Sequence, residues 1–578
     1  MTADRVPLAF RAQIDGRCQL QRINTRIPGQ DNDAYLWAKE WLKGAAKYPP
    51  NFGQQVKTKD YQITWRFVTN SGQDEGIIRP VIGGKGHAFY PGSSMKGAFR
   101  RAFRKRFPNE RDRLQHYCGS PAGDSETKPG ILRFHGAYPI DDSWQKDSIV
   151  DVVHPQEPWQ VESNRSGGAF FMISLLRPTL KFGISSNEEL SKEKWDEIWS
   201  VWEAALGYGI GSRVSAGYGQ IAKHEANKIL SVALKGEGLI SKRVDGSSEF
   251  RPNMFKAALR GHTLRLFGGV VDENTAQALT KKLWGGFAGR DGSIVGELGI
   301  AFDYQEQCLN IKQSGRIPRY ELATGQLDIL AFKSIITPKR HQELTEFVTK
   351  LIQFSMIVGG FGKSWRRASH RKFYSNASYC DSKQDIGCHW EFVGDSDKLY
   401  ILFDSRESIC KYFQELHTYI KSWITKELQR ENKIFKASPT SWREAWCNSD
   451  KAQVWIRFDS DKKPVSDALD WLHLQGDQDN ALKKTHLSGE MGKIGRLWQR
   501  MYPGNIKPQA SQAPRKSSNS SSSAAFERHK PGMQKSVQRQ YIEFLKIFPE
   551  LDPQGQNQRK EAAFLGYLKN QSNFQRVW

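Results

Sequence analysis

The sequence has few cysteines, no long apolar run and a shortage of acidic residues. Its 578 residues include seven cysteines and no CxxC pair, which argues against a zinc ribbon and against a disulfide framework. Cys380, Cys388 and His389 lie near one another in the sequence but lack a fourth ligand at zinc-finger spacing. We therefore interpret the cysteines as reduced thiols and predict no metal ligands among them.

The lack of long apolar runs argues against a membrane partner, and the excess of basic residues indicates which kind of partner to expect. No uncharged apolar run approaches the ~18 residues that cross a bilayer, and the opening MTADRVPLAF lacks the apolar core of a signal peptide. We expect a cytoplasmic protein with no membrane partner. Asp and Glu number 62 against 85 Lys and Arg, which gives a formal net charge of +23. This excess favours a polyanionic partner, and nucleic acid first.

The length predicts several domains, and composition marks one linker near the end of the chain. Residues 509–532 are rich in Ser, Pro and charge and cannot form a core, so we predict a disordered linker at 504–535. The following RQYIEFLKIFPEL has the spacing of a short amphipathic helix. We expect a small C-terminal helical appendage at 536–578, able to dock on a partner.

The chain contains an internal repeat. The stretch FRPNMFKAALR echoes YPGSSMKGAFR, and aligning Lys256 with Lys96 also aligns Arg260 with Arg100. In both copies a Gly-led apolar strand follows (GILRFHGAY and GELGIAFDY), and then a Gly-rich loop after a helix (LGYGIGSRVSAGYGQI and VGGFGKSWRRASHRKF). Three blocks in the same order indicate two copies of one domain.

Each copy reads as strand, helix, one or more strands, helix and a last strand. The predicted fold class is α+β, with two tandem ferredoxin-like, RRM-like βαββαβ domains that carry insertions. We place the first domain at 58–226 and the second at 227–503, after an N-terminal extension at 1–57. Such domains leave a sheet face and connecting loops for RNA.

The first basic helix is predicted to bind phosphate. Pro-Gly ends the preceding strand, and Ser93 or Ser94 can cap the helix and leave its first N–H groups facing outward. Lys96, Arg100 and Arg104 recur every four residues on one face, whereas Met95, Phe99 and Phe103 would face the core. A solvated basic face is the alternative, but the recurrence in the second copy favours phosphate binding.

The Gly-rich loops have two possible roles: glycine clusters often only form tight turns, but they can also let another backbone approach closely. Since cations accompany both loops, we predict that they let an RNA backbone approach closely. The remaining predicted RNA-binding residues are Gly209, Gly211, Arg213, Lys256, Arg260, Gly360, Gly362 and Lys363.

These segments resemble the RAMP superfamily, the repeat-associated proteins of CRISPR effector complexes. YPGSSMKGAFR is similar to the family's signature helix entry, LGYGIGSRVSAGYGQI to its Gly-rich loop, and FRPNMFKAALR to a second form of the signature. Two signatures in one chain resemble a fused pair of type III backbone subunits. The resemblance implies a protein that binds CRISPR guide RNA, pairs it with target RNA and contacts other subunits of the complex.

Several such subunits cut the target, and the resemblance then implies an endoribonuclease with an aspartate upstream of the signature helix and a divalent metal, Mg²⁺ by expectation. Asp74 and Asp245 are the candidates, and attack by the ribose 2′-OH would leave a 2′,3′-cyclic phosphate. Asp beside Gly is also a common turn former. Two alternatives stay open: a guide-binding scaffold that cuts nothing, and a free-standing nuclease that processes precursor guide RNA.

Overall fold

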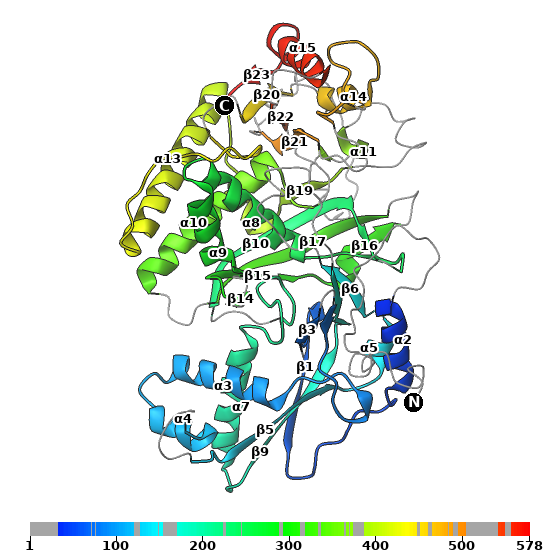
Figure 1. Cartoon of the computed structure of the whole chain (residues 1–578), viewed down its shortest axis with the longest axis vertical. Helices are drawn as coiled ribbons and strands as arrows, with labels where there is room; N and C mark the ends of the chain where they lie inside the picture. The colour runs from blue at the N-terminus through cyan, green and yellow to red at the C-terminus, as the bar shows by residue number, and fades with distance from the viewer. Residues whose placement is uncertain are drawn as a thin grey trace, which may run out of the picture.

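The computed structural model shows three α+β units that follow one another along the chain (Figure 1). The α+β fold class is therefore confirmed. The structure describes residues 33–70, 72–74, 77–120, 128–147, 149–153, 170–222, 227–243, 245–287, 293–312, 318–332, 337–362, 366–368, 370–373, 387–447, 451–459, 465–483, 485–488, 495–504, 541–549 and 556–578.

The first unit has the predicted ferredoxin-like plan. Its main elements are β1 (Lys57–Gln62), α3 (Gly92–Arg106), β5 (Leu132–Pro139), β9 (Thr179–Ser186) and α7 (Lys192–Leu206). The antiparallel sheet has the order β1-β9-β5, so the third strand lies between the first and the second. The Gly-rich loop takes the place of a fourth strand: the N–H of Thr64 donates to the carbonyl of Gln220 at 2.9 Å, and that of Gly219 to Arg66 at 2.7 Å.

Smaller elements decorate this unit. A second sheet has the order β3-β4-β7-β6, and β2 pairs with β8. The bounds are α2 (Asp33–Gly44), β2 (Arg66–Phe67), β3 (Gly72–Asp74), β4 (Ile77–Arg79), α4 (Arg111–Cys118), α5 (Ser143–Lys146), β6 (Val150–Val153), β7 (Phe170–Ile173) and β8 (Leu175–Leu176).

The second unit repeats the plan with all four strands. Its elements are β10 (Lys228–Leu239), α8 (Asn253–Gly268), α9 (Glu273–Trp284), β15 (Leu298–Asp303), β17 (Arg319–Ala331), α10 (Pro338–Val358) and β19 (His389–Phe392). The order β15-β17-β10-β19 is antiparallel throughout and places the strands second, third, first and fourth. Short additions are β11 (Ser241–Lys242), β12 (Ser248–Glu249), β13 (Gly286–Phe287), β14 (Ser293–Ile294) and β16 (Leu309–Lys312).

A third unit with the same plan follows the long helix α13 (Arg406–Arg430). It consists of β20 (Gln453–Phe458), α14 (Asp467–His473), β21 (Leu497–Pro503), β22 (Tyr541–Ile547), α15 (Gln556–Asn570) and β23 (Gln575–Arg576). The sheet order β21-β22-β20-β23 again reads second, third, first and fourth, and β18 (Arg366–Arg367) adds to its edge. Two units were predicted, so this one is a finding of the structure.

The prediction for the C-terminal region was therefore wrong in two respects. The segment 541–547, predicted as an amphipathic helix, is strand β22, and it lies between β21 and β20 inside the third sheet. The region after the predicted linker is hence an integral part of a unit and not an appendage. The strand is buried along its whole length, and a strand buried on both faces carries an apolar run that periodicity alone does not separate from a helix.

The third sheet is covered on both faces. Val454, Ile456 and Phe544 belong to the core that the helices of the second unit share, whereas Trp455 and Leu545 pack in the core that contains α14 and α15. An RRM-type sheet binds RNA through an open face. Since neither face of the central strands is open here, the third unit has no such platform among its described residues.

A buried ion-pair network joins the first unit to the second. Arg66, fully buried in the first unit, donates to both carboxylate oxygens of Glu249 at 2.7 and 2.6 Å, and the Trp65 indole donates to the same group at 3.0 Å. Arg251 of the second unit pairs with buried Asp151 of the first at 2.5 Å. Burial would raise the pKa of Glu249, but Arg66 holds it below its ordinary value. The network fixes the two units against each other.

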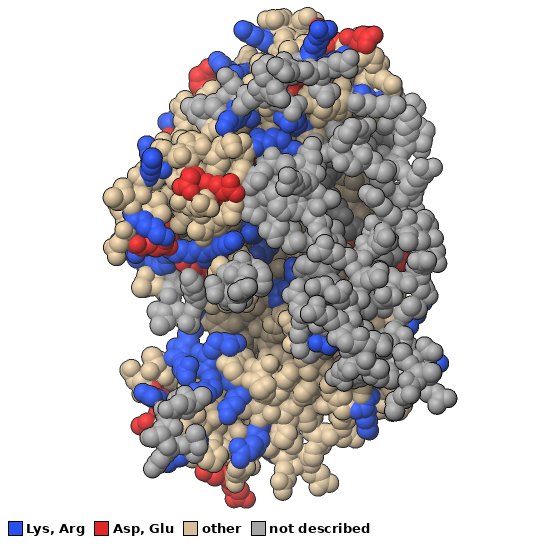
Figure 2. Space-filling view, in the orientation of Figure 1, with Lys and Arg blue, Asp and Glu red and all other residues tan. Residues whose placement is uncertain are grey.

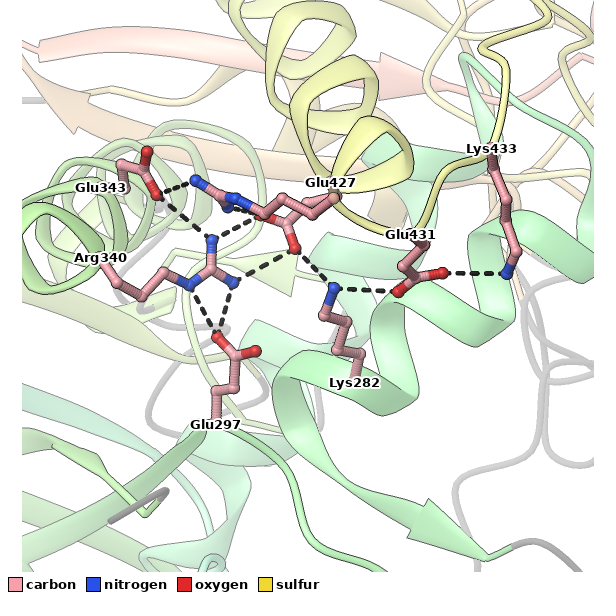
Figure 3. Close-up of polar contacts among 8 residues, drawn as sticks. Lys282, Glu297, Arg340, Glu343, Glu427, Glu431 and Lys433 are labelled. Atoms are coloured by element: carbon pink, nitrogen blue, oxygen red, sulfur yellow. Dashed lines mark hydrogen bonds and ion pairs between the residues drawn. The ribbon is translucent and has the colours of Figure 1, made fainter. Parts of the chain in front are cut away.

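A second network fastens α13 onto α9 and α10 (Figure 3). Glu427 of α13 is 2% exposed and accepts from Lys282 of α9 at 3.0 Å and from Arg340 of α10. Arg340 also reaches Glu297, just before β15, at 2.6 Å. Burial would raise the pKa of Glu427, but the two cations lower it. Glu427 is therefore ionised at neutral pH and connects three helices.

Candidate nucleic-acid interface

The basic row of the first unit lies on α3 as predicted. Met95, Phe99 and Phe103 of this helix are completely buried. Lys96 and Arg100 are half-buried and Arg104 is exposed, and none of these three cations forms an ion pair with a carboxylate in the described part of the chain. Figure 2 shows Lys and Arg side chains gathered over the region of α3. An unpaired row of cations is a surface that attracts phosphates.

The three cations share one neighbourhood. The thiol of Cys118, at the end of α4, is buried, and burial raises its pKa to about 11 although Lys96, Arg100 and Arg104 all act to lower it. The thiol is therefore protonated at neutral pH and leaves the charge of the row uncompensated. Two other cations of the helix are engaged: Lys105 donates to the Tyr208 hydroxyl and Arg106 to Ser200 of α7.

The predicted cap of this helix is wrong. Ser93 and Ser94 lie inside the first turn with exposed side chains, the N-cap is Pro91, and no side chain caps the helix. The cause is a contact outside the helix: Gly92 packs so closely on β5 that a Cβ there would lie 2.0 Å from the carbonyl oxygen of Phe134. This contact, which only glycine permits, starts the helix before the serines.

The first Gly-rich loop is shaped by contacts within its own unit. Gly209 and Gly211 have φ values of +77° and +82°, and a Cβ on Gly211 would lie 2.2 Å from the carbonyl oxygen of Val68. The N–H of Ser212 donates to the same carbonyl at 2.8 Å. The turn reading therefore accounts for both glycines, and their predicted contact with RNA stays a prediction.

The structure brings together cations from both sequence copies. Lys256, at the start of α8, donates to the Ser215 hydroxyl of the first Gly-rich loop at 2.6 Å. Its surroundings lower its pKa to about 7: burial is the largest cause, and the nearby charges of Arg260 and Arg213 add to it. The predicted residues Arg213, Lys256 and Arg260 thus form one cluster between two units. Ser215 was not predicted, because nothing in its local sequence marks it.

The second Gly-rich loop also faces its own fold. Gly360 and Gly362 have φ values of +60° and +103°. The carbonyl between them, on Phe361, accepts from the Trp390 indole of β19 at 3.1 Å. Lys363 lies outside the described residues.

The third unit contacts the end of the helix that leads into this loop. Arg500 of β21 donates to the carbonyl of Met356 at 2.8 Å, and Lys546 of β22 donates to that of Ile357 at 3.0 Å. Both carbonyls belong to the last turn of α10, where cations stabilise the free carbonyl groups of a helix. Sequence reasoning missed both residues, because buried cations within apolar strands have no recognisable spacing.

The two candidate aspartates lie in hairpins. Asp74 is the last residue of β3 and pairs with Ile77 of β4 across the turn, and its side chain lies outside the described residues. Asp245 lies between β11 and β12, where its carboxylate accepts from the N–H of Ser247 at 2.9 Å and from the Ser247 hydroxyl at 2.5 Å. Arg243 is 3.9 Å away. These contacts are those of a turn-forming aspartate.

The expected divalent metal has no site in the part of the chain that the structure describes. No group of three or more His, Cys, Asp or Glu residues is placed there to hold a metal ion. Mg²⁺ takes oxygen ligands in near-octahedral geometry, and Asp245 offers a single carboxylate whose oxygens are already engaged by Ser247 and Arg243. Asp245 alone therefore provides no site for the ion, the side chain of Asp74 lies outside the described residues, and we derive no chemical step through the ion.

Tandem ferredoxin-like units that carry a row of cations without ion pairs among the described residues belong to the class of proteins that can bind a polyanion. Residues 76–222, which include α3 and the first Gly-rich loop, match the model of the RAMP superfamily. This match supports a CRISPR-associated RNA-binding role for the first unit. No curated protein matches the chain. Within the described residues, no helix combines the length and apolar character needed to cross a membrane.

Proposed function

We propose that the chain is a subunit of a type III CRISPR effector complex that binds guide RNA along α3 and holds it for pairing with target RNA. One observation carries the proposal: Lys96, Arg100 and Arg104 form a row without ion pairs inside the segment that matches the RAMP family. Such a row gains by neutralising phosphates, because bound counterions are released. The partners are guide RNA, target RNA and other subunits of the complex.

We further propose that the subunit cleaves the bound target RNA. The ribose 2′-OH attacks the adjacent phosphorus, a carboxylate accepts the hydroxyl proton, and the bond from phosphorus to the 5′ oxygen breaks. The leaving oxygen takes up a proton from water and becomes a 5′-hydroxyl, and the other product ends in a 2′,3′-cyclic phosphate. Since the carboxylate of Asp245 is held by Ser247 and Arg243, Asp74 is the better candidate for the base.

The contacts of Asp245 also favour a second candidate function, a scaffold that binds guide RNA and cuts nothing. In a scaffold both aspartates serve their hairpins alone. The two functions share the α3 surface and differ only in cleavage.

Cleavage of a labelled, guide-complementary RNA by the assembled complex separates the two functions. We expect Asp74→Ala to abolish product bands that the wild type forms with Mg²⁺, and Asp245→Ala to leave them in place, with guide RNA retained in both. Asp60→Ala, which removes an exposed carboxylate on β1, is the matched control. Wild-type cleavage that persists in EDTA would exclude the expected metal. Bands unchanged in the Asp74/Asp245 double variant would make the chain a scaffold.

A further inference from the structure

The turn η3 (Gly84–Gly86), which lies between β4 and α3, is hydrogen-bonded to α2, to the segment after α2 and to β5. The carbonyl of its middle residue, Lys85, accepts from the N–H of Ala46 at 3.0 Å. The carbonyl of its last residue accepts from the indole of Trp41 in α2 at 2.8 Å, and the N–H of its first residue donates to the Tyr138 hydroxyl of β5 at 3.1 Å. The turn is therefore fixed in place, and the segment after α2 lies against it.

The middle residue of this turn, Lys85, has an unfavourable backbone conformation. Its φ of +56° and ψ of +23° lie in the left-handed region, which a residue with a Cβ adopts at an energetic cost and glycine adopts freely. Glycine stands on both sides of it, and its own side chain is exposed. A lysine at a position that glycine would fill more easily indicates that the side chain itself has a use.

The segment after α2 presents an exposed aromatic ring beside this turn. Tyr48 is 70% exposed, and the ammonium group of Lys47 lies over its ring, 5.6 Å from the centre. Pro49 and Pro50 come next and restrict the backbone. Pro50 also packs closely on the turn, because a Cβ on Gly84 would lie 3.2 Å from its Cγ. The ring of Tyr48 is therefore exposed on a rigid segment.

The two segments that meet here carry charge of one sign. Residues 42–59 contain lysines and no Asp or Glu, and residues 77–108 contain Lys and Arg and no Asp or Glu. Neither Lys47 nor Lys85 forms an ion pair with a carboxylate in the part of the chain that the structure describes. An exposed ring next to two such cations fits a ligand that has both a flat face and negative charge, and a nucleotide of single-stranded RNA has both.

This group, which we call the Tyr48 platform and define as Lys47, Tyr48 and Lys85, lies apart from the basic row of α3. The amide of Gln145 in α5 donates to the carbonyl of Ala46 at 3.4 Å, which places the platform near α5 as well as α2. In Figure 1, α2 and α5 lie on one side of the first unit and α3 lies on the other. The two surfaces can therefore be tested independently.

We propose that the Tyr48 platform binds one unpaired nucleotide of a single-stranded RNA: the base stacks on the tyrosine ring, and the ammonium groups of Lys47 and Lys85 contact the flanking phosphates. Since Lys47 lies over one face of the ring, the base takes the other. Stacking on an aromatic ring tolerates every base, so the site adds affinity without a preference for sequence. The inference rests on the RNA-binding part of the proposed function and depends on neither cleavage nor α3.

Binding of a labelled oligouridine by the full chain, measured by fluorescence anisotropy, tests the proposal. Tyr48→Ala should weaken binding at least about fivefold, as the loss of one stacked base does, whereas Tyr48→Phe should bind as the wild type does. Phe458→Ala, which removes an exposed ring from β20 of the third unit, is the matched control and should have no effect. An abasic oligomer of the same length keeps the phosphates and lacks the bases, so Tyr48→Ala should not change its binding.

The two lysines are tested by charge and by stability. Lys85→Gly removes the charge together with the unfavourable backbone conformation, so it should weaken RNA binding without lowering the melting temperature. Combined with Lys47→Ala, it should reduce the magnitude of the slope of log K against log salt by about 1.4, whereas Tyr48→Ala should leave the slope unchanged. Removal of Lys411 and Lys426, both exposed on α13, is the control and should leave the slope as it is.

Three results would overturn the inference: equal binding of oligouridine by the wild type and Tyr48→Ala, an equal loss with the abasic oligomer, or a lower melting temperature in Lys85→Gly. If one of them occurs while removal of the α3 cations still lowers the salt slope, this inference fails and the proposed function stands. If the Tyr48 effect is present while the α3 variant keeps the full slope, the assignment of RNA binding to α3 is contradicted alone.

Discussion

The salt dependence of RNA binding gives the sharpest test of the α3 surface. Each phosphate that a cation neutralises on single-stranded nucleic acid contributes about 0.7 to the slope of log K against log salt. Lys96, Arg100 and Arg104 have no ion pairs within the described chain, so all three charges are free to act on phosphates. Changing the three residues to Ala should therefore reduce the magnitude of the slope by about 2.

Fluorescence anisotropy of a labelled single-stranded RNA, titrated at several KCl concentrations, measures this slope. A fourfold rise in salt should weaken wild-type binding about twentyfold more than binding by the triple variant. The matched control removes three exposed lysines outside the first unit, Lys411, Lys426 and Lys483. If both triple variants lower the slope equally, only the net charge matters, and the assignment of a site to α3 is refuted.

Two further predictions concern buried charge. Glu427→Gln should lower the free energy of unfolding by about 3 kcal/mol in urea denaturation, because it removes the buried carboxylate that Lys282 and Arg340 share. Glu343→Gln, at a carboxylate 19% exposed, should cost less than about 1 kcal/mol. The pKa of Lys256 is about 7 in the folded chain and 10.5 for a free lysine. Between pH 7 and pH 10.5 the unfolded chain therefore binds more protons at this residue than the folded chain does, so raising the pH from 7 to 9 should stabilise the fold. Lys256→Met should remove this pH-dependent gain and Lys96→Met should keep it; equal pH profiles for the wild type and Lys256→Met would contradict the assignment.

The sequence was sufficient for features that local patterns determine. The four-residue spacing of Met95, Phe99 and Phe103 predicted the buried face of α3, and the paired blocks around Lys96 and Lys256 predicted two units of one plan. These features depend on helix periodicity and on repetition, both of which a single sequence displays.

The third unit was not predicted, because it lacks the basic helix that the first two units share. Its first helix, α14, carries Asp467 and Asp470 where α3 and α8 carry basic residues. A signal was present nonetheless: Gly130, Gly296 and Gly495 each lie two residues before the first residue of the second strand of a unit, and that first residue is always Leu. The third unit thus keeps the glycine before its second strand although it lacks the basic helix.

Other errors arose from contacts that no local pattern contains. Ser93 and Ser94 have the residue types of helix caps, but the close packing of Gly92 on Phe134 decides where the helix begins. The cluster of Arg213, Lys256 and Arg260 depends on how two units meet, so the sequence suggested each residue separately without the group.

The position of β22 inside the third sheet determines how the chain can be shortened. A protein that ended at residue 504 would lack the strand that lies between β21 and β20, together with α15 and β23. The apolar faces of Trp498 and Phe403, which now pack against Phe548 and Phe544, would be opened to water. Such a protein should aggregate, because both remaining neighbours would present bare strand edges. Segments for expression are therefore better chosen by sheet order than by the composition of the linker.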